Sequence, residues 1–172
     1  MAWMKLAGAL GLAAAAAGAR ADEYFAYTFI GATTQASGFL QAVTTGTSSL
    51  AVVSGSLDAG PGGVYSILFN PGATQPYLSP SGHFIVDNRV DMTASQPITW
   101  YGLLFADAGG AEVNIWSNGV GTPYTFYAHG PSGDVVDQGS FTITAIPAPG
   151  AATVLGVAGV WMVTGRRRPA LA

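Results

Sequence analysis

Apolar and polar side chains alternate along much of the chain between Asp22 and Ala145. In several short segments every second residue is bulky and apolar, and β-branched and aromatic types are frequent. A period of two is the pattern of half-buried β-strands. The clearest strands are predicted at 25–30, 113–116, 124–127 and 141–144, and others at 50–57, 64–69 and 84–87.

Two further segments depart from this simple alternation. Residues 98–105 are apolar on both faces, which predicts a central strand covered from two sides. Residues 33–49 are rich in Thr, Ser, Gly and Gln, and this composition leaves a weak edge hairpin and an ordered loop both open.

Clusters of Gly, Pro, Asn and Asp separate the apolar segments and predict turns. They lie at 58–63, 70–72, 79–82, 107–110, 117–119 and 130–134. About eight or nine strands at this spacing predict an all-β domain, either an antiparallel β-sandwich or a short barrel, with a jelly-roll-like arrangement.

The first residues carry a different pattern. Residues 1–5 contain one cation, residues 6–17 are apolar, and small residues stand at Ala19 and Ala21. This order is typical of a secretory signal peptide over residues 1–21, with cleavage after Ala21. The mature domain is therefore expected to span residues 22–145 and to begin at Asp22.

The end of the chain has three parts in a fixed order. Pro147, Ala148, Pro149 and Gly150 form a segment that is incompatible with a helix interior. An uncharged apolar run over 151–165 predicts a single helix, short for a membrane span. Three adjacent cations then follow, namely Arg166, Arg167 and Arg168.

This order resembles the PEP-CTERM sorting signal of Gram-negative bacteria, with Ala148 where that family usually has Glu. The resemblance covers residues 146–168 and implies recognition and processing by an exosortase, a membrane-embedded enzyme. It implies a surface or extracellular-matrix protein, since the family is associated with exopolysaccharide-producing bacteria.

A membrane topology follows from the charges at the two ends. The Arg cluster is expected to act as a stop signal that stays in the cytoplasm with residues 169–172, because positively charged flanks remain inside. The chain would leave through the Sec translocon, pass through an intermediate anchored in the inner membrane, and reach the cell surface or the extracellular space.

Charge narrows the classes of partner for the mature domain. Residues 22–145 hold one cation, Arg89, and nine acids, a net charge of −8 with neutral histidines. Nucleic acid and anionic lipid are therefore not expected as ligands, since phosphate binding needs cations. Metal cations, neutral sugars and extracellular polysaccharide remain compatible. The chain has no cysteine, so packing and strand pairing must stabilise the domain.

Candidate metal ligands cluster between two predicted strands. Asp87, Asn88 and Asp91 offer the oxygen donors that calcium prefers, and Asp107 with Glu112 forms a second candidate. The alternative is that these are solvated loop residues. His83 and His129 lie far apart in the sequence, and a role as surface or strand-end residues is favoured for both.

Two function classes remain open. The favoured one is a non-enzymatic exported surface protein without a catalytic site or any cofactor other than calcium. The alternative is a secreted carbohydrate-binding module or carbohydrate-active enzyme, with aromatic side chains stacked on sugar rings. Residues considered for that stacking are Trp116, Tyr124 and Tyr127, which are otherwise ordinary core aromatics.

Overall fold

The computed structural model describes residues 22–45, 49–60, 63–69 and 76–148. The predicted signal peptide, Pro149, Gly150, the apolar segment 151–165 and the Arg cluster lie outside these ranges. Within the described ranges, no helix has the length and apolar character needed to cross a membrane.

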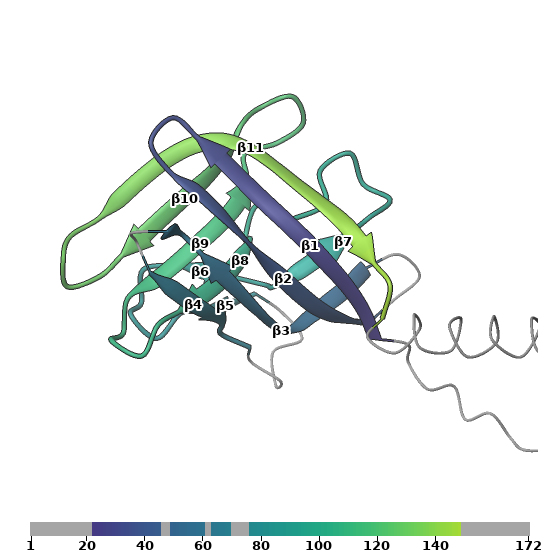
Figure 1. Ribbon diagram of the computed structural model, residues 1–172, viewed down its shortest axis with the longest axis horizontal. Helices are drawn as coiled ribbons and strands as arrows, with labels where there is room; N and C mark the ends of the chain where they lie inside the picture. Colours follow the sequence, from purple (N-terminus) through teal and green to yellow (C-terminus); the bar gives the residue numbers. More distant parts are fainter. Residues whose placement is uncertain (1–21, 46–48, 61–62, 70–75, 149–172) are drawn as a thin grey trace, which may run out of the picture.

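The described residues form an all-β, antiparallel structure (Figure 1). Its strands are β1 (Asp22–Gly31), β2 (Gln35–Thr44), β3 (Ser49–Asp58), β4 (Val64–Ile67), β5 (Tyr77–Leu78), β6 (Ile85–Val86), β7 (Arg89–Asp91), β8 (Leu103–Ala106), β9 (Glu112–Ser117), β10 (Tyr124–His129) and β11 (Val135–Ile146).

Eight of these strands close into a barrel. Each of β1, β2, β3, β4, β8, β9, β10 and β11 pairs with its neighbour in this order, and β11 returns to pair with β1. The all-β antiparallel prediction is confirmed, and of its two alternatives the structure shows the barrel. The jelly-roll-like expectation was wrong, because neighbouring barrel strands follow one another along the chain without Greek-key crossings.

Side chains fill the inside of the barrel. The interior cluster includes Phe25, Tyr27, Phe29, Phe105, Phe126 and Phe141, all buried. Tyr27 lies between the rings of Phe105 and Phe141, with ring centroids 5.9 and 5.6 Å away. An eight-stranded barrel has an interior just wide enough for side chains to fill. The middle of this barrel is therefore a packed core and not a channel.

One buried hydroxyl satisfies its hydrogen bond across this core. The Tyr27 phenol donates to the carbonyl of Ser56 at 2.8 Å. Burial raises the pKa of Tyr27 far above its usual value. Gly38 leaves room for this contact, because a Cβ there would lie 1.9 Å from the Ser56 oxygen and 2.8 Å from the phenol.

A second, smaller layer covers the outside of the barrel between β4 and β8. The chain leaves the wall after β4, forms the β5–β6 hairpin and β7, and re-enters at β8. Phe84 and Val86 of this excursion bury Leu104 on the outer face of β8. Leu103 and Phe105 face the interior cluster. The strand is thus buried on both faces.

Two segments differ from their predictions. Residues 35–44 form β2, which pairs on both sides within the closed wall and is no edge strand. The predicted strand over 98–105 begins only at Leu103. Before it, Gly102 has a φ of 77°, and Trp100 is 73 % exposed. The apolar run therefore contains a turn that its composition conceals.

Gly102 is expected to be required at this turn for two separate reasons. Its φ is positive, and an added Cβ would lie 2.3 Å from the Ile115 carbonyl oxygen. Gly82 has the same φ of 77° but no atom within 4 Å of the added Cβ. Gly82→Ala should therefore lower the free energy of unfolding by about 1–2 kcal/mol. Gly102→Ala should cost about 1–3 kcal/mol more.

Urea denaturation of the two variants beside the parent measures this difference. Equal losses for Gly82→Ala and Gly102→Ala would show that backbone conformation alone determines the need for glycine and that the contact with Ile115 relaxes freely.

Candidate functional site

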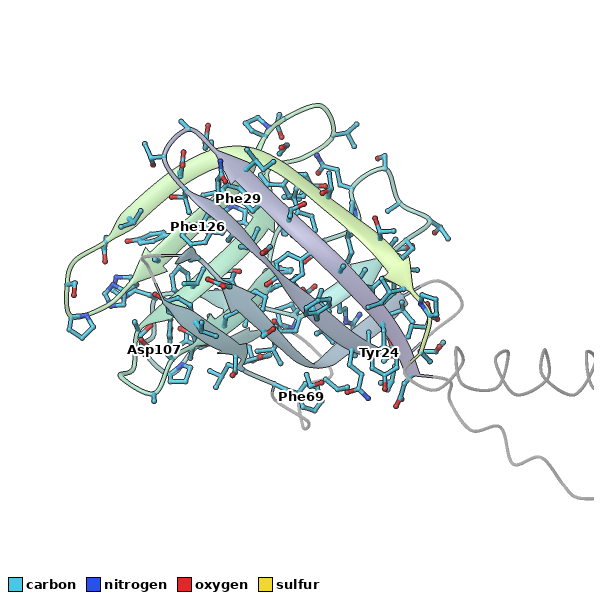
Figure 2. The ribbon with its side chains drawn as sticks, viewed as in Figure 1. Tyr24, Phe29, Phe69, Asp107 and Phe126 are labelled. Carbon is cyan, nitrogen blue, oxygen red and sulfur yellow. The ribbon has the colours of Figure 1, made fainter. Side chains whose placement is uncertain are left out.

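The two ends of the barrel differ. Asp22 begins β1 and Ile146 ends β11, and the pair Tyr24–Ile146 places both at one end. The opposite end, where Gly31 pairs with Gly139, is an open mouth. In Figure 2, Tyr24 lies at the first end and Asp107 at the second. Asp22 and Ile146, the chain junctions at which the barrel continues into the rest of the chain, therefore lie at the opposite end of the barrel from the mouth.

A cleft of about 890 Å³ opens at this mouth. The β1–β2 turn, the β8–β9 loop and the β10–β11 loop surround it, and Tyr65 and Phe126 contribute aromatic rings. Phe126 packs on Phe29 with ring centroids 5.5 Å apart, so the interior cluster forms the floor of the cleft (Figure 2). The cleft is therefore shallow, with a fixed apolar floor and polar loops around it.

Among the described residues that line the cleft, Asp107 supplies the one carboxylate. Its Oδ1 accepts backbone N–H groups from Gly109 at 2.8 Å and Ala111 at 2.9 Å. These two hydrogen bonds stabilise the β8–β9 loop, to which Asp107 itself belongs. Glu112, its partner in the sequence prediction, is buried and binds Ser81, so the structure gives the two acids separate roles.

A buried carboxylate holds the β1–β2 turn against the cleft. Asp137 of β11 accepts backbone N–H groups from Thr33 at 2.8 Å, Thr34 at 2.7 Å and Ala32 at 3.2 Å, and also the Thr33 hydroxyl. The bonds from Thr33 are foremost in lowering the pKa of Asp137 far below its usual value. These bonds favour the ionised form.

We expect this turn to lose stability in acid. The folded pKa of Asp137 lies below its unfolded value of about 3.9. Its contribution is therefore complete above the unfolded value and is lost as the pH falls toward the folded one. In thermal melts between pH 7 and pH 2, Asp137→Asn should lower Tm most at neutral pH, and the difference from the parent should shrink in acid.

Asp58→Asn is the matched control, because Asp58 is an exposed carboxylate at the end of β3 that accepts one N–H among the described residues, from Gly60 at 2.8 Å. If Asp137→Asn lowered Tm equally at every pH, the ionised carboxylate would not be the source of the stability.

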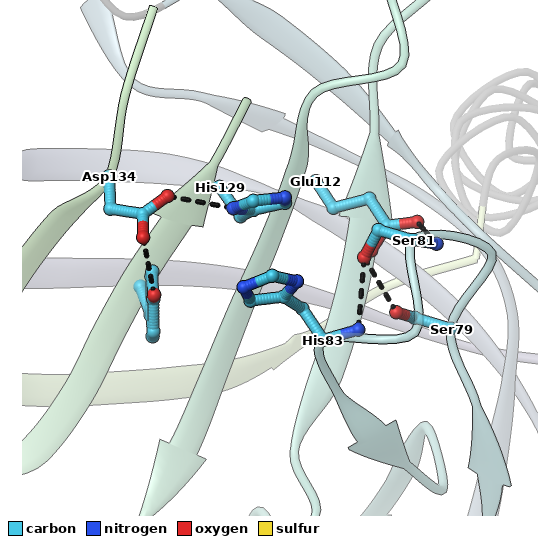
Figure 3. Close-up of polar contacts among 7 residues, drawn as sticks. Ser79, Ser81, His83, Glu112, His129 and Asp134 are labelled. Carbon is cyan, nitrogen blue, oxygen red and sulfur yellow. Dashed lines mark hydrogen bonds and ion pairs between the residues drawn. The ribbon is translucent and has the colours of Figure 1, made fainter. Parts of the chain in front are cut away.

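The two histidines meet at the rim of the mouth (Figure 3). His83 precedes β6 and His129 ends β10, and their rings stack with centroids 3.6 Å apart and an interplanar angle of 16°. His129 Nδ1 lies 2.7 Å from Asp134 Oδ1. One ligand atom from each of these residues lies within 4.8 Å of the others, and His129 also lines the cleft.

Neighbouring side chains fix this cluster. The Tyr127 hydroxyl donates to Asp134 Oδ2 at 2.7 Å, and this bond is the main cause of the lowered pKa of Asp134. Phe84, next to His83, packs edge-on against Tyr127 with centroids 5.2 Å apart. Each residue of the cluster is thus joined to a packed or hydrogen-bonded neighbour.

The loop that carries His83 is anchored to the barrel by the buried Glu112 of β9. This carboxylate accepts the Ser81 N–H at 3.0 Å and the Ser81 hydroxyl at 2.5 Å. The Ser81 hydroxyl oxygen in turn accepts the His83 N–H at 3.2 Å. The position of His83 therefore depends on strand β9 of the barrel wall (Figure 3).

The residues predicted to bind calcium lie in β7 and directly before it, where Asn88 is buried and Asp87 and Asp91 are half-buried. Asn88 is 2 % exposed with a φ of 48°. Its side-chain amide donates to the Leu68 carbonyl at 2.9 Å and to the Tyr77 phenol at 2.8 Å, and its Oδ1 accepts the Leu104 N–H at 2.7 Å. These contacts give Asn88 a structural role that the sequence did not reveal.

The two neighbouring carboxylates are also engaged. Asp87 accepts the Thr99 hydroxyl at 2.8 Å, and burial raises the pKa of Asp87 despite this bond. Asp91 accepts the N–H and hydroxyl of Thr93 at 2.9 and 2.6 Å. Calcium at Asp87, Asn88 and Asp91 stays a prediction, while the described bonds join these residues to protein groups.

The aromatic residues considered for sugar stacking have separate environments. Tyr124 is buried against Phe141, with centroids 5.3 Å apart, as an ordinary core residue. Tyr127 holds Asp134, and Trp116 donates its indole N–H to Asn118 at 3.1 Å. None of these three is among the cleft-lining residues, which include the rings of Tyr65, Phe126 and His129.

Comparisons of the chain with protein-family models, with curated proteins and with solved structures found no match.

Proposed function

We propose that this chain is an exported bacterial surface or extracellular-matrix protein that a C-terminal sorting tail holds in the inner membrane until an exosortase processes it. The proposal rests on the sequence of the tail, in which Pro147–Gly150, an apolar run and three arginines follow one another. The barrel is its non-catalytic passenger.

The single observation that supports it most is the position of the domain ends. The described pairs of β1 with β2 and β11 all involve residues after Ala21, the predicted signal cleavage site. β11 ends at Ile146, and Pro147 and Ala148 follow as exposed residues outside any strand. Cleavage after Ala21 or beyond Ile146 would leave all the described barrel pairs intact, as a processed passenger domain requires.

The same pairing of β1 with β11 predicts how the barrel would be oriented relative to the membrane. Both junctions lie at one end of the barrel, and the mouth lies at the other. A chain held by its C-terminal tail would therefore present the cleft and the histidine cluster away from the membrane.

The test alters the two parts of the tail separately, in a host that carries an exosortase. Replacing Arg166, Arg167 and Arg168 with Gln should release uncleaved chains, because each arginine costs roughly 2.5–3.5 kcal/mol at the bilayer centre and stops translocation. Replacing Pro147 and Pro149 with Ala should leave chains inserted but unprocessed, because the helix then extends through the cleavage segment.

Cell fractionation with intact-mass analysis distinguishes these products from the parent. Glu23→Gln, an exposed substitution in β1, serves as the control that should be exported and trimmed normally. Normal trimming of both tail variants would refute sorting by this tail.

The cleft favours a second candidate, a module that binds neutral saccharides. The floor of the cleft contains the rings of Tyr65 and Phe126, and its rim contains Thr33, Thr34 and Ser132. None of the described lining residues is a lysine or an arginine. Hydrolysis of glycosides ordinarily uses two carboxylates, whereas Asp107 stands alone among the described lining residues. This candidate is therefore a binding function.

Titration with neutral oligosaccharides, followed by amide NMR shifts, tests this candidate. Shifts should gather on the β1–β2 turn and the β10–β11 loop. Ala128→Phe should abolish them by filling the cleft, since Ala128 lines it. Thr144→Phe adds the same ring at an exposed site near the chain junctions and should bind normally. Shifts that persist in Ala128→Phe would place binding elsewhere.

A further inference from the structure

We propose that His83, His129 and Asp134 bind a divalent transition-metal ion, of which zinc is the representative, at the rim of the mouth. Their ligand atoms lie within 4.8 Å of one another in a part of the structure outside the residues predicted to bind calcium. Each residue is hydrogen bonded, stacked or packed, so the group is assembled before any ion arrives.

The donor set selects the kind of ion. Two imidazole nitrogens and one carboxylate oxygen suit zinc, copper or nickel, whereas calcium and magnesium prefer oxygen ligands throughout. Three protein ligands also leave one position of a tetrahedral ion open to water. Because His83 is exposed and the other two residues are near the surface, an ion reaches the site directly from solvent.

The distances require only small movements. Zinc bonds to nitrogen or oxygen are about 2.0–2.2 Å long, so two ligands of a tetrahedral ion lie roughly 3.3–3.6 Å apart. Ligand atoms within 4.8 Å of one another therefore need to close by roughly 1.5 Å at most. Rotation of the His83 ring out of its parallel stack with His129 supplies this movement at an exposed position.

The surroundings have the form of a second coordination shell. Carboxylate ligands of metals are usually held by a further hydrogen bond. Here the Tyr127 hydroxyl binds Asp134 Oδ2, which leaves Oδ1 toward His129. The Ser81–Glu112 bonds fix the loop of His83. The net charge of −8 between residues 22 and 145 also favours the approach of a cation.

A bound ion would connect two parts of the fold. His83 belongs to the excursion that covers the outside of the barrel, and His129 and Asp134 flank the β10–β11 loop. At present, stacking and the Phe84–Tyr127 contact join these segments. The ion would add a cross-link between them beside the cleft, which His129 also lines.

The experiment titrates Zn²⁺ into the full chain, purified without a histidine tag, and measures the dissociation constant by calorimetry and Tm by thermal melts. One ion should bind per chain and raise Tm, while Ca²⁺ at the same concentration should not. The chain has no histidines besides these two, so bound Cu²⁺ should show two coupled nitrogens in its electron paramagnetic resonance spectrum.

Variants then assign the ligands. His83→Gln, His129→Gln and Asp134→Asn should each raise the Zn²⁺ dissociation constant by tenfold or more. Tyr127→Phe should raise it by about tenfold with all three ligands present, as expected for an outer-shell partner. Glu23→Gln removes an exposed acid near the other end of the barrel and should bind like the parent.

Thermal melts without metal show whether each variant is folded. His83→Gln is the decisive variant, because His83 is exposed and belongs to neither buried cluster. Unchanged Zn²⁺ affinity in His83→Gln would overturn the proposal, as would absence of binding to the parent or equal binding of Ca²⁺.

Discussion

The antiparallel pairing of β1 with β11 is the constraint on which the rest of the structure depends. Eight residue pairs, from Tyr24–Ile146 to Gly31–Gly139, join the first strand of the barrel to the last. Closure removes the unpaired edges that an open sheet would expose. It also fixes both chain junctions at one end, so that the loops at the other end are free to form a cleft.

Closure leaves the interior too narrow to serve as a binding chamber, and polar chemistry is therefore concentrated at the surface. Phenylalanine and tyrosine rings fill the middle of the barrel, and the cleft extends only to Phe126. The outer layer adds what the barrel lacks. Asn88 joins the segment between β4 and β8 to the wall through Leu68, Tyr77 and Leu104. The same excursion then carries His83 to the rim beside His129.

The sequence predicted the parts of this fold that depend on local patterns. Alternation identified most strands, and the Gly- and Pro-rich clusters at 79–82, 107–110, 117–119 and 130–134 identified turns between them, whereas the cluster at 70–72 lies outside the described residues. It failed at β2, because the polar, glycine-containing composition of 35–44 conceals the inward-facing Leu40 and Ala42. It also failed at Gly102, where an apolar run hides a positive φ. In both segments tertiary contacts determine the backbone conformation and override local propensity.

The histidine cluster shows why sites are harder to predict than strands. One half of it was readable in principle, since a four-residue turn, 130–133, separates His129 from Asp134, and a hairpin there sets the two side by side. The other half was not. His83 reaches them only because Phe84 buries against the outer face of the barrel and Glu112 binds Ser81. No spacing rule encodes that docking. A local hairpin thus supplies two of the three side chains, and a long-range apolar contact supplies the third. The cluster therefore stays assembled only while the outer layer remains packed on the barrel.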